Sequence, residues 1–389
     1  MRSFLSKKVV DIKPSGIRKF FDIASEIKGC ISLGVGEPDF DTPWHIREEG
    51  IYSLEQGKTI YTSNAGLKAL RMEIASYLER KINTKYQWDT QVLVTVGGSE
   101  AIDLALRAII EDGDEIIIPT PCYVSYEPCC VLAGAKVKTI ALRNEDDFRL
   151  TPELLNEAIT PKTKAIIMNF PNNPTGAIME YADLEKIAKV IIEHDLLVIS
   201  DEIYSELSYY DNHVSIAQIE GMYERTLVIN GFSKSFSMTG WRLGYCCGPA
   251  ELIKQMTKIH QFCIMCAPTT SQYAAVEALK NGDNDVEYMR ESYNERRLFV
   301  LHRLKEMGLP CFTPKGAFYV FPDIRKFNMS SDDFALRLLE EEKVVVVPGS
   351  AFGKSGDGFI RISYAYSIED LKKALDRVER FVNRLNNEK

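Results

Sequence analysis

Short runs of β-branched residues alternate with stretches of helical periodicity, and this alternation constrains the fold of the chain more than any other feature. Five of the runs are almost entirely apolar: 92–96, 115–118, 165–169, 197–200 and 226–229. Strands that are apolar throughout are typical of parallel sheets, in which both faces are buried. Between them, 99–110 and 181–194 place apolar residues on one face of a helix. We therefore predict right-handed βαβ units and an open α/β sheet flanked by helices.

The pattern changes near residue 281, which predicts two domains. The first 44 residues contain no βαβ unit, and a predicted strand at 31–35 has no obvious local partner. We assign 45–280 to a large domain with a mostly parallel sheet, and 1–44 together with 281–389 to a smaller α+β domain. The elements predicted after residue 281 are a charged helix at 286–307, a half-exposed strand at 316–321, a strand at 344–347 and a C-terminal helix after Ser367.

The charge and hydropathy of the chain exclude several classes of function. Its 389 residues carry 47 basic and 55 acidic side chains, a net charge of −8 without any basic run, so we expect no nucleic-acid partner. No apolar stretch approaches the roughly 18 residues that cross a bilayer, so we expect no membrane partner. The chain reaches Asp11 before an apolar signal core can form, which predicts a cytoplasmic protein.

Nine cysteines include two adjacent pairs, which do not resemble a disulfide framework. Three residues, His260, Cys263 and Cys266, have a spacing that occurs in metal sites. The same spacing also arises on one face of a buried helix, and a single CxxC without a second pair is a weak signal. We therefore expect reduced thiols and no metal.

Two motifs follow predicted strands and could contact an anion or an oxygen. Gly97, Gly98 and Ser99 open a helix, so free backbone N–H groups and the positive helix end could bind a phosphate. Their spacing matches neither a Walker loop nor a complete GxGxxG, and such turns also use glycine for packing alone. The turn at 170–176 contains Asn173, whose amide can donate to an oxygen without adding charge, although a plain turn has the same composition.

Two further motifs carry ionisable groups at strand ends. Asp201, followed by Tyr204, emerges from an apolar strand, where a buried carboxylate is costly unless a cation faces it. A helix N-cap is the structural alternative for this aspartate. Lys234 lies among small hydroxyl residues, eight positions before Arg242. A lysine in such a pocket can lose its proton and become a nucleophile, although a solvated lysine is the simpler reading of that residue alone.

The four motifs come together because the carboxyl ends of parallel strands meet at one edge of a sheet, where α/β folds bind their ligands. They supply a phosphate seat, an arginine, a carboxylate, a phenol, an amide and a reactive amine. This set fits pyridoxal 5'-phosphate, with the amine for its aldehyde, the acid for its ring nitrogen, and the phenol and amide for its ring oxygen.

In this order and spacing, the motifs resemble those of class I pyridoxal-phosphate-dependent aminotransferases of fold type I. The similar branch contains aspartate, aromatic and N-acetyl-diaminopimelate aminotransferases. The resemblance extends from 16–20 and 36–40 to 359–363. It implies a large domain with a mostly parallel sheet, a smaller α+β domain and pyridoxal phosphate as cofactor. It also implies ping-pong transfer of an amino group from an aromatic, aspartate-like or diaminopimelate-type L-amino acid to a 2-oxo acid such as 2-oxoglutarate.

The resemblance also implies a role for each matching residue. Lys234 would bond to the cofactor aldehyde and, once freed by substrate, move the proton. Asp201 would keep the ring nitrogen protonated, while Tyr204 and Asn173 would hydrogen-bond the ring oxygen. The remaining cofactor contacts would be Tyr123, stacked on the ring, and a phosphate cradle of Gly98, Ser99, Glu100, Ser233 and Arg242. The substrate contacts would be Arg361 on the α-carboxylate, with Gly36, Tyr123 and Asn173.

The segment 61–66 resembles a family loop whose tyrosine reaches the phosphate of the neighbouring subunit. This implies a homodimer with shared sites, in which Tyr61 serves the partner's cofactor. A surface tyrosine that covers the following helix is the structural alternative.

Two questions of activity stay open at the level of sequence. No cation is evident for a second substrate carboxylate, which favours a broader or aromatic preference over aspartate. A C–S β-lyase on the same fold is the alternative reaction, because its first steps are identical. Release of ammonia and pyruvate from cystathionine without any oxo acid would select the lyase.

Overall fold

A sheet of seven strands forms the centre of the computed structural model, which describes residues 4–14, 16, 27–210 and 212–388. The strand order is β2-β8-β7-β6-β5-β3-β4, and only β8 runs antiparallel to its neighbours. The five predicted apolar runs form β2, β3, β5, β6 and β7, which confirms the mostly parallel α/β sheet. The bounds are β2 Val92–Thr95, β3 Glu115–Thr120, β4 Lys136–Ala141, β5 Thr163–Asn169, β6 Leu197–Asp201, β7 Thr226–Gly231 and β8 Gly244–Cys247.

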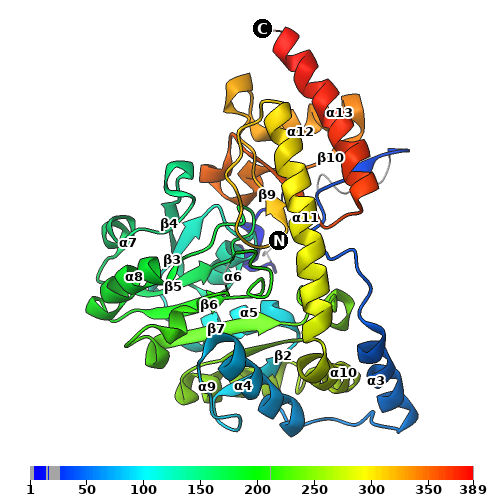
Figure 1. Cartoon of the computed structure of the whole chain (residues 1–389). Coiled ribbons are helices and arrows are strands. Elements are labelled where there is room, and N and C mark those ends of the chain that lie inside the picture. The colour runs from blue at the N-terminus through cyan, green and yellow to red at the C-terminus, as the bar shows by residue number, and fades with distance from the viewer. Residues whose placement is uncertain (1–3, 15, 17–26, 211, 389) are drawn as a thin grey trace.

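Helices cover both faces of this sheet, which explains why its strands are apolar throughout. Ile116 and Ile118 of β3 face a buried cluster with α5, α6 and α9, whereas Ile117 faces a second cluster with α7 and α8. Figure 1 shows the helices around the strands. Their bounds are α3 Trp44–Glu55, α4 Lys68–Ile82, α5 Gly97–Ile109, α6 Tyr126–Ala133, α7 Pro152–Ala158, α8 Tyr181–Glu193, α9 Ala250–Cys263 and α10 Thr269–Asn281; a short α1, Lys7–Val10, precedes them.

The C-terminal part of the chain gathers above the central sheet in the view of Figure 1, and the long α11 runs from beside the sheet into this part. Its elements are α11 Asp283–Glu306, β9 Tyr319–Val320, α12 Ser331–Glu342, β10 Val344–Val345, β11 Val347–Pro348, β12 Ile360–Ser363 and α13 Ile368–Asn387. The last helix begins as predicted, since the Ser367 hydroxyl accepts a hydrogen bond from the Asp370 backbone N–H at 3.1 Å. The valine run at 344–347 forms two short strands, β10 and β11, rather than one.

The prediction that the strand at 316–321 is half-exposed is wrong. Only β9 forms within this run, paired with β12 in an antiparallel sheet of order β11-β12-β9. Ala317 to Phe321 are all buried, because α11 also packs against β9. The run therefore belongs to the core.

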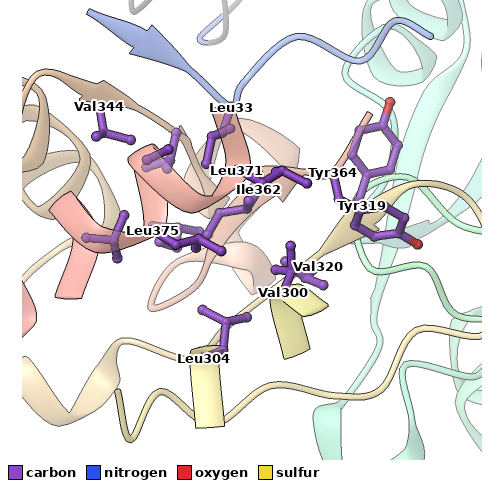
Figure 2. Close-up of a cluster of buried hydrophobic side chains, with 14 of the residues drawn as sticks. Leu33, Val300, Leu304, Tyr319, Val320, Val344, Ile362, Tyr364, Leu371 and Leu375 are labelled. Carbon is purple, nitrogen blue, oxygen red and sulfur yellow. The ribbon is translucent and has the colours of Figure 1, made fainter. Parts of the chain in front are cut away.

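The N-terminal segment packs with the C-terminal part of the chain. β1, Ile31–Ser32, pairs in parallel with β10, so the predicted strand without a local partner finds one more than 300 residues away. Leu33 lies in the same buried cluster as Val320, Val344 and Leu371 (Figure 2). This packing supports the proposed assignment of both chain ends to one domain. In the described part of the chain, no helix combines the length and hydropathy needed to cross a bilayer.

Candidate active site

A cavity of about 320 Å³ lies at the carboxyl ends of the central strands. β5 and β6 are neighbours whose last residues, Asn169 and Asp201, stand side by side in the sheet, and β7 follows next to β6. The turns after these strands therefore converge on one space. The cavity collects most of the residues predicted from sequence: Gly36, Gly98, Ser99, Tyr123, Asn173, Asp201, Tyr204, Ser233, Lys234, Arg242 and Arg361.

One wall of the cavity is built to receive an anion. α5 begins at Gly97, so the backbone N–H groups of its first turn have no partner within the helix. Arg242 lies directly against this turn, because a Cβ on Gly97 would come within 2.8 Å of its Nη2. Gly244 permits the close packing of β8 on the turn, since a Cβ there would lie 2.6 Å from the Gly98 nitrogen. The Arg242 Nη1 donates to the Thr239 carbonyl at 2.9 Å, and no carboxylate of the described residues pairs with it.

Asp201 places a buried carboxylate at the base of the cavity. Its side chain is 6% exposed, and it accepts hydrogen bonds from the Tyr126 hydroxyl at 2.6 Å and the Ile203 backbone N–H at 3.2 Å. Burial nevertheless raises the pKa of this carboxyl to about 6. No ion pair joins it to a cation within the described residues. A partner that presents a positively charged N–H would therefore suit it well.

Lys234 extends its amine into the same space. Its Nζ donates to the Gly36 carbonyl at 2.6 Å. Burial lowers the pKa of this amine to about 8; the nearby charges of Arg361 and Arg242 add to the effect, and Glu37 opposes it. An amine with this pKa holds an appreciable neutral fraction near physiological pH, which a nucleophile or base requires.

Arg361 is a buried guanidinium with spare hydrogen-bonding capacity. It is 3% exposed; its Nη1 donates to Asn173 Oδ1 at 2.9 Å, and its Nη2 donates to the Gly34 carbonyl. Its Nε has no partner, and no carboxylate forms an ion pair with it in the described residues. A buried charge in this state calls for an anion from outside the chain. Because Asn173 accepts through its oxygen, its amide nitrogen is the group that can donate.

Tyr126 and Tyr319 also line the cavity, and neither was predicted as a site residue. The Tyr126 hydroxyl donates a hydrogen bond to Asp201. The ring of Tyr123 packs edge-to-face against the ring of Tyr126, with the ring centroids 5.5 Å apart. The hydroxyl of Tyr319, on β9, lies 2.7 Å from the hydroxyl of Tyr204. In the sequence, Tyr319 stands out only as part of a predicted strand. No sequence signal links Tyr126 to Asp201.

Two predicted residues, Glu100 and Tyr61, do not line the cavity. α5 begins at Gly97, so Glu100 lies at the end of its first turn, where its side chain does not reach the cavity lining. Its carboxylate accepts instead from the Val96 backbone N–H at 2.5 Å and pairs with His260 Nδ1 at 2.7 Å. Tyr61 is 76% exposed on the surface.

The sequence motif at His260 assembles no metal site in the described residues. His260 is buried and bonded to Glu100, whereas Cys263 is exposed. The described residues contain no group of three or more potential ligands arranged for a metal ion, and all nine cysteines are free.

At the edge of the mostly parallel sheet, the cavity brings together Lys234, the buried acid Asp201, and two arginines, Arg242 and Arg361, that have no ion-pair partner in the described part of the chain. The family model for aminotransferase class I and II matches residues 28–378, and the chain belongs to this family. It is therefore an aminotransferase, which acts on amino acid and oxo acid substrates. Members of this family generally depend on pyridoxal phosphate.

Named relatives and solved structures agree with this assignment. The chain is 52% identical to the putative aminotransferase YugH of Bacillus subtilis, over 99% of this chain and 100% of that protein. It is 48% identical to an aspartate aminotransferase of Pyrococcus abyssi, over 97% of each chain. The crystal structure of an aromatic aminotransferase from Pyrococcus horikoshii superposes with a TM-score of 0.90 at 46% identity, over 95% of this chain and 99% of that one. These names favour amino-group transfer over the lyase.

Proposed function

We propose that this aminotransferase binds pyridoxal 5'-phosphate in the cavity and uses Lys234 as both its covalent anchor and its proton-transfer group. The observation that carries the proposal is the convergence of Lys234, Asp201, Arg242 and Arg361 on one space, each without an ion-pair partner in the described residues. Unpaired charged groups in a single cavity are typical of a site that receives a charged ligand.

The residues fit the parts of the cofactor one by one. The first turn of α5 and Arg242 suit a phosphate dianion. Asp201 suits a protonated ring nitrogen, because a cation there would offset the cost of burying its carboxylate. Tyr204 and the Asn173 amide suit the ring oxygen, and Tyr123 can pack against the ring. Ser99 and Ser233, whose side chains are not fully buried, can add donors to the phosphate.

The mechanism follows from what each residue can hold or move. When bound, the cofactor supplies an aldehyde that accepts the amino group and a ring that withdraws the electron pair of the broken bond at the substrate α-carbon. Arg361 binds the substrate α-carboxylate with its spare donors, close to the Gly36 backbone, and so orients the α-carbon. Lys234, freed by the incoming amino group, takes the α-proton, a role its pKa of about 8 suits. Asp201 retains the proton on the ring nitrogen.

The proposed substrates are an L-amino acid donor and a 2-oxo acid such as 2-oxoglutarate, used in turn. The cations that line the cavity in the described residues are Lys234, Arg242 and Arg361, and each has a role above. None remains for a second carboxylate, while Tyr123 and Tyr319 add aromatic surface. This supports an aromatic or broad preference over aspartate, within a family whose named relatives include both kinds.

We also propose a homodimer in which Tyr61 serves the neighbouring site. Ile60, Tyr61 and Phe262 are 78%, 76% and 86% exposed. Their two segments lie side by side, because the Asn64 amide donates to the Met265 carbonyl at 2.8 Å. Exposed apolar residues gathered on adjacent segments are what a protein–protein interface requires.

A panel of amino acids assayed against 2-oxoglutarate tests the function. The proposal expects the 2-oxo acid of the donor and glutamate in equal amounts, with parallel double-reciprocal plots because the route is ping-pong. The same protein should release no pyruvate or ammonia from cystathionine when no oxo acid is present. Release under those conditions, without glutamate formation from any donor, would favour the lyase.

A further inference from the structure

Tyr319 is a buried tyrosine between the two halves of the site. It is 1% exposed, and its hydroxyl oxygen lies 2.7 Å from that of Tyr204. Its ring supports Arg361, whose guanidinium carbon lies 4.4 Å from the ring centroid. Figure 2 shows Tyr319 at the edge of the buried cluster, its hydroxyl turned away from the aliphatic side chains. Tyr319 thus contacts both the residue proposed for the ring oxygen and the residue proposed for the substrate carboxylate.

A phenol carries one proton, so the two hydroxyls cannot both donate to each other. If Tyr204 donates to the cofactor's ring oxygen, as the proposed function requires, its oxygen must act as the acceptor of the 2.7 Å bond. Tyr204 is also the one hydrogen-bond partner of the Tyr319 hydroxyl among the described residues. We propose that Tyr319 is a positioning residue that donates its proton to Tyr204 and thereby aims the Tyr204 proton into the cavity.

The surroundings of Tyr319 favour this direction of donation. The Arg361 charge against the ring stabilises the anionic form of the phenol, and so opposes the rise that burial gives to the pKa of Tyr319. Arg361 also opposes the rise that burial gives to the pKa of Tyr204, but of the two phenol rings it contacts only that of Tyr319, so its charge strengthens Tyr319 more as a donor. The Gly36 backbone leaves room for this hydroxyl, since a Cβ on Gly36 would lie 2.2 Å from it. The hydroxyl is therefore fixed in place beside Tyr204.

This arrangement connects the substrate carboxylate to the cofactor ring through two hydroxyls. A carboxylate on Arg361 neutralises the charge beneath Tyr319, which weakens its donation to Tyr204. The Tyr204 donation to the ring oxygen weakens in turn, because hydrogen bonds in a chain polarise one another. Tyr319 acts on the reaction only through Tyr204 and Arg361, and the inference rests on the proposed function.

The test is a pH titration of the absorption band of the cofactor bound to Lys234. A donor to the ring oxygen stabilises its negative charge, so loss of that donor raises the pH midpoint of the spectral change. Tyr319→Phe keeps the ring under Arg361 and removes only the hydroxyl, and we expect the midpoint to rise by roughly 0.2–0.5 pH unit. The turnover number should fall several-fold, while KM for the amino acid should change little.

A double variant separates positioning from a general structural effect. If Tyr319 acts through Tyr204, the midpoint of Tyr204→Phe/Tyr319→Phe should equal that of Tyr204→Phe alone. Tyr319→Leu also removes the support of Arg361, so KM should rise for every amino acid. Tyr364→Phe is the matched control, because Tyr364 is equally buried and its hydroxyl donates to the Ala317 carbonyl at 2.9 Å, away from the cavity lining. It should leave the midpoint unchanged.

An unchanged midpoint in Tyr319→Phe would overturn the inference. A double variant whose midpoint shift equals the sum of the two single shifts would overturn it as well. Failure of the proposed function would look different. In that case the wild-type protein would show no pH-dependent cofactor band, or Lys234→Ala would keep it.

Discussion

Asp201 should make the cofactor-free protein less stable as the pH rises, and Asp201→Asn should remove this effect. The pKa of the carboxyl is about 6 in the folded chain, against 3.8 for an ordinary aspartate, chiefly because the group is buried. This difference corresponds to about 3 kcal/mol of unfolding free energy. The substitution keeps the size of the side chain and removes the charge, so cofactor-free Asp201→Asn should gain up to that amount at neutral pH.

The sign follows from the direction of the pKa change. Between about pH 4 and pH 6 the folded protein holds the proton on Asp201 more tightly than the unfolded chain does, so wild-type stability falls as the pH rises through this window. Above about pH 6, Asp201 is ionised in the folded protein and the full destabilisation by its buried charge is present. Lys234 contributes no change within the window, because its pKa of about 8 keeps it charged there.

Thermal unfolding of the cofactor-free proteins from pH 4 to pH 8 measures the effect. For a chain of this size, about 3 kcal/mol corresponds to roughly 4 °C in Tm, so the two curves should meet near pH 4 and differ by that amount at pH 8. Asp195→Asn is the control, since its side chain is 91% exposed and should follow the wild type. With cofactor bound, the wild type should have a higher Tm than Asp201→Asn, because only the carboxylate pairs with a protonated ring nitrogen. A constant difference between the curves at every pH would refute the reasoning.

Three further substitutions test other parts of the site. Arg361→Lys replaces the bidentate fork with a point charge and should raise KM about 10- to 100-fold for every amino acid, in steady-state assays across the donor panel; a rise for one donor alone would place this arginine in a side-chain pocket. Gly244→Ala would put a Cβ 2.6 Å from the backbone at the start of α5 and should weaken cofactor binding by spectral titration, whereas Gly240→Ala, with no atom within 4 Å, should not. Mixed Tyr61→Phe and Lys234→Ala chains should gain activity above either parent as hybrids form, because one hybrid site then carries neither lesion; no gain after subunit exchange would contradict a shared site.

The sequence predicts five of the seven strands of the central sheet, without β4 and β8, and the convergence of its motifs, because these depend on local patterns. Strands buried on both faces leave apolar runs, and residues that follow neighbouring parallel strands must meet at one edge. β4 escaped prediction because it lies at the edge of the sheet, where Lys136 and the other exposed residues interrupt the apolar pattern. The 316–321 run alternates like a half-exposed strand, but packing by α11 buries both of its faces.

The supporting residues of the site could not be predicted in the same way. Tyr126 and Asp201 are 75 residues apart, and Tyr204 and Tyr319 are 115 apart, so only the tertiary fold brings each pair together. The local sequence does not show whether the hydroxyls of Tyr126 and Tyr319 form hydrogen bonds in the site or whether the two rings only pack in the core. The carboxylate of Glu100 bonds to the Val96 backbone N–H and to His260, which lies 160 residues further along the chain, so the fold and not the local motif decides its role.

The central claim is that Lys234 carries the cofactor, and reduction of the intact enzyme tests it most directly. Borohydride applied to the cofactor-loaded protein should convert the link between lysine and cofactor into a stable bond. Proteolysis and mass spectrometry should then find the modification on the peptide that contains Lys234, and Lys234→Ala should lose it. A modification found on another lysine, or retained in Lys234→Ala, would contradict the account.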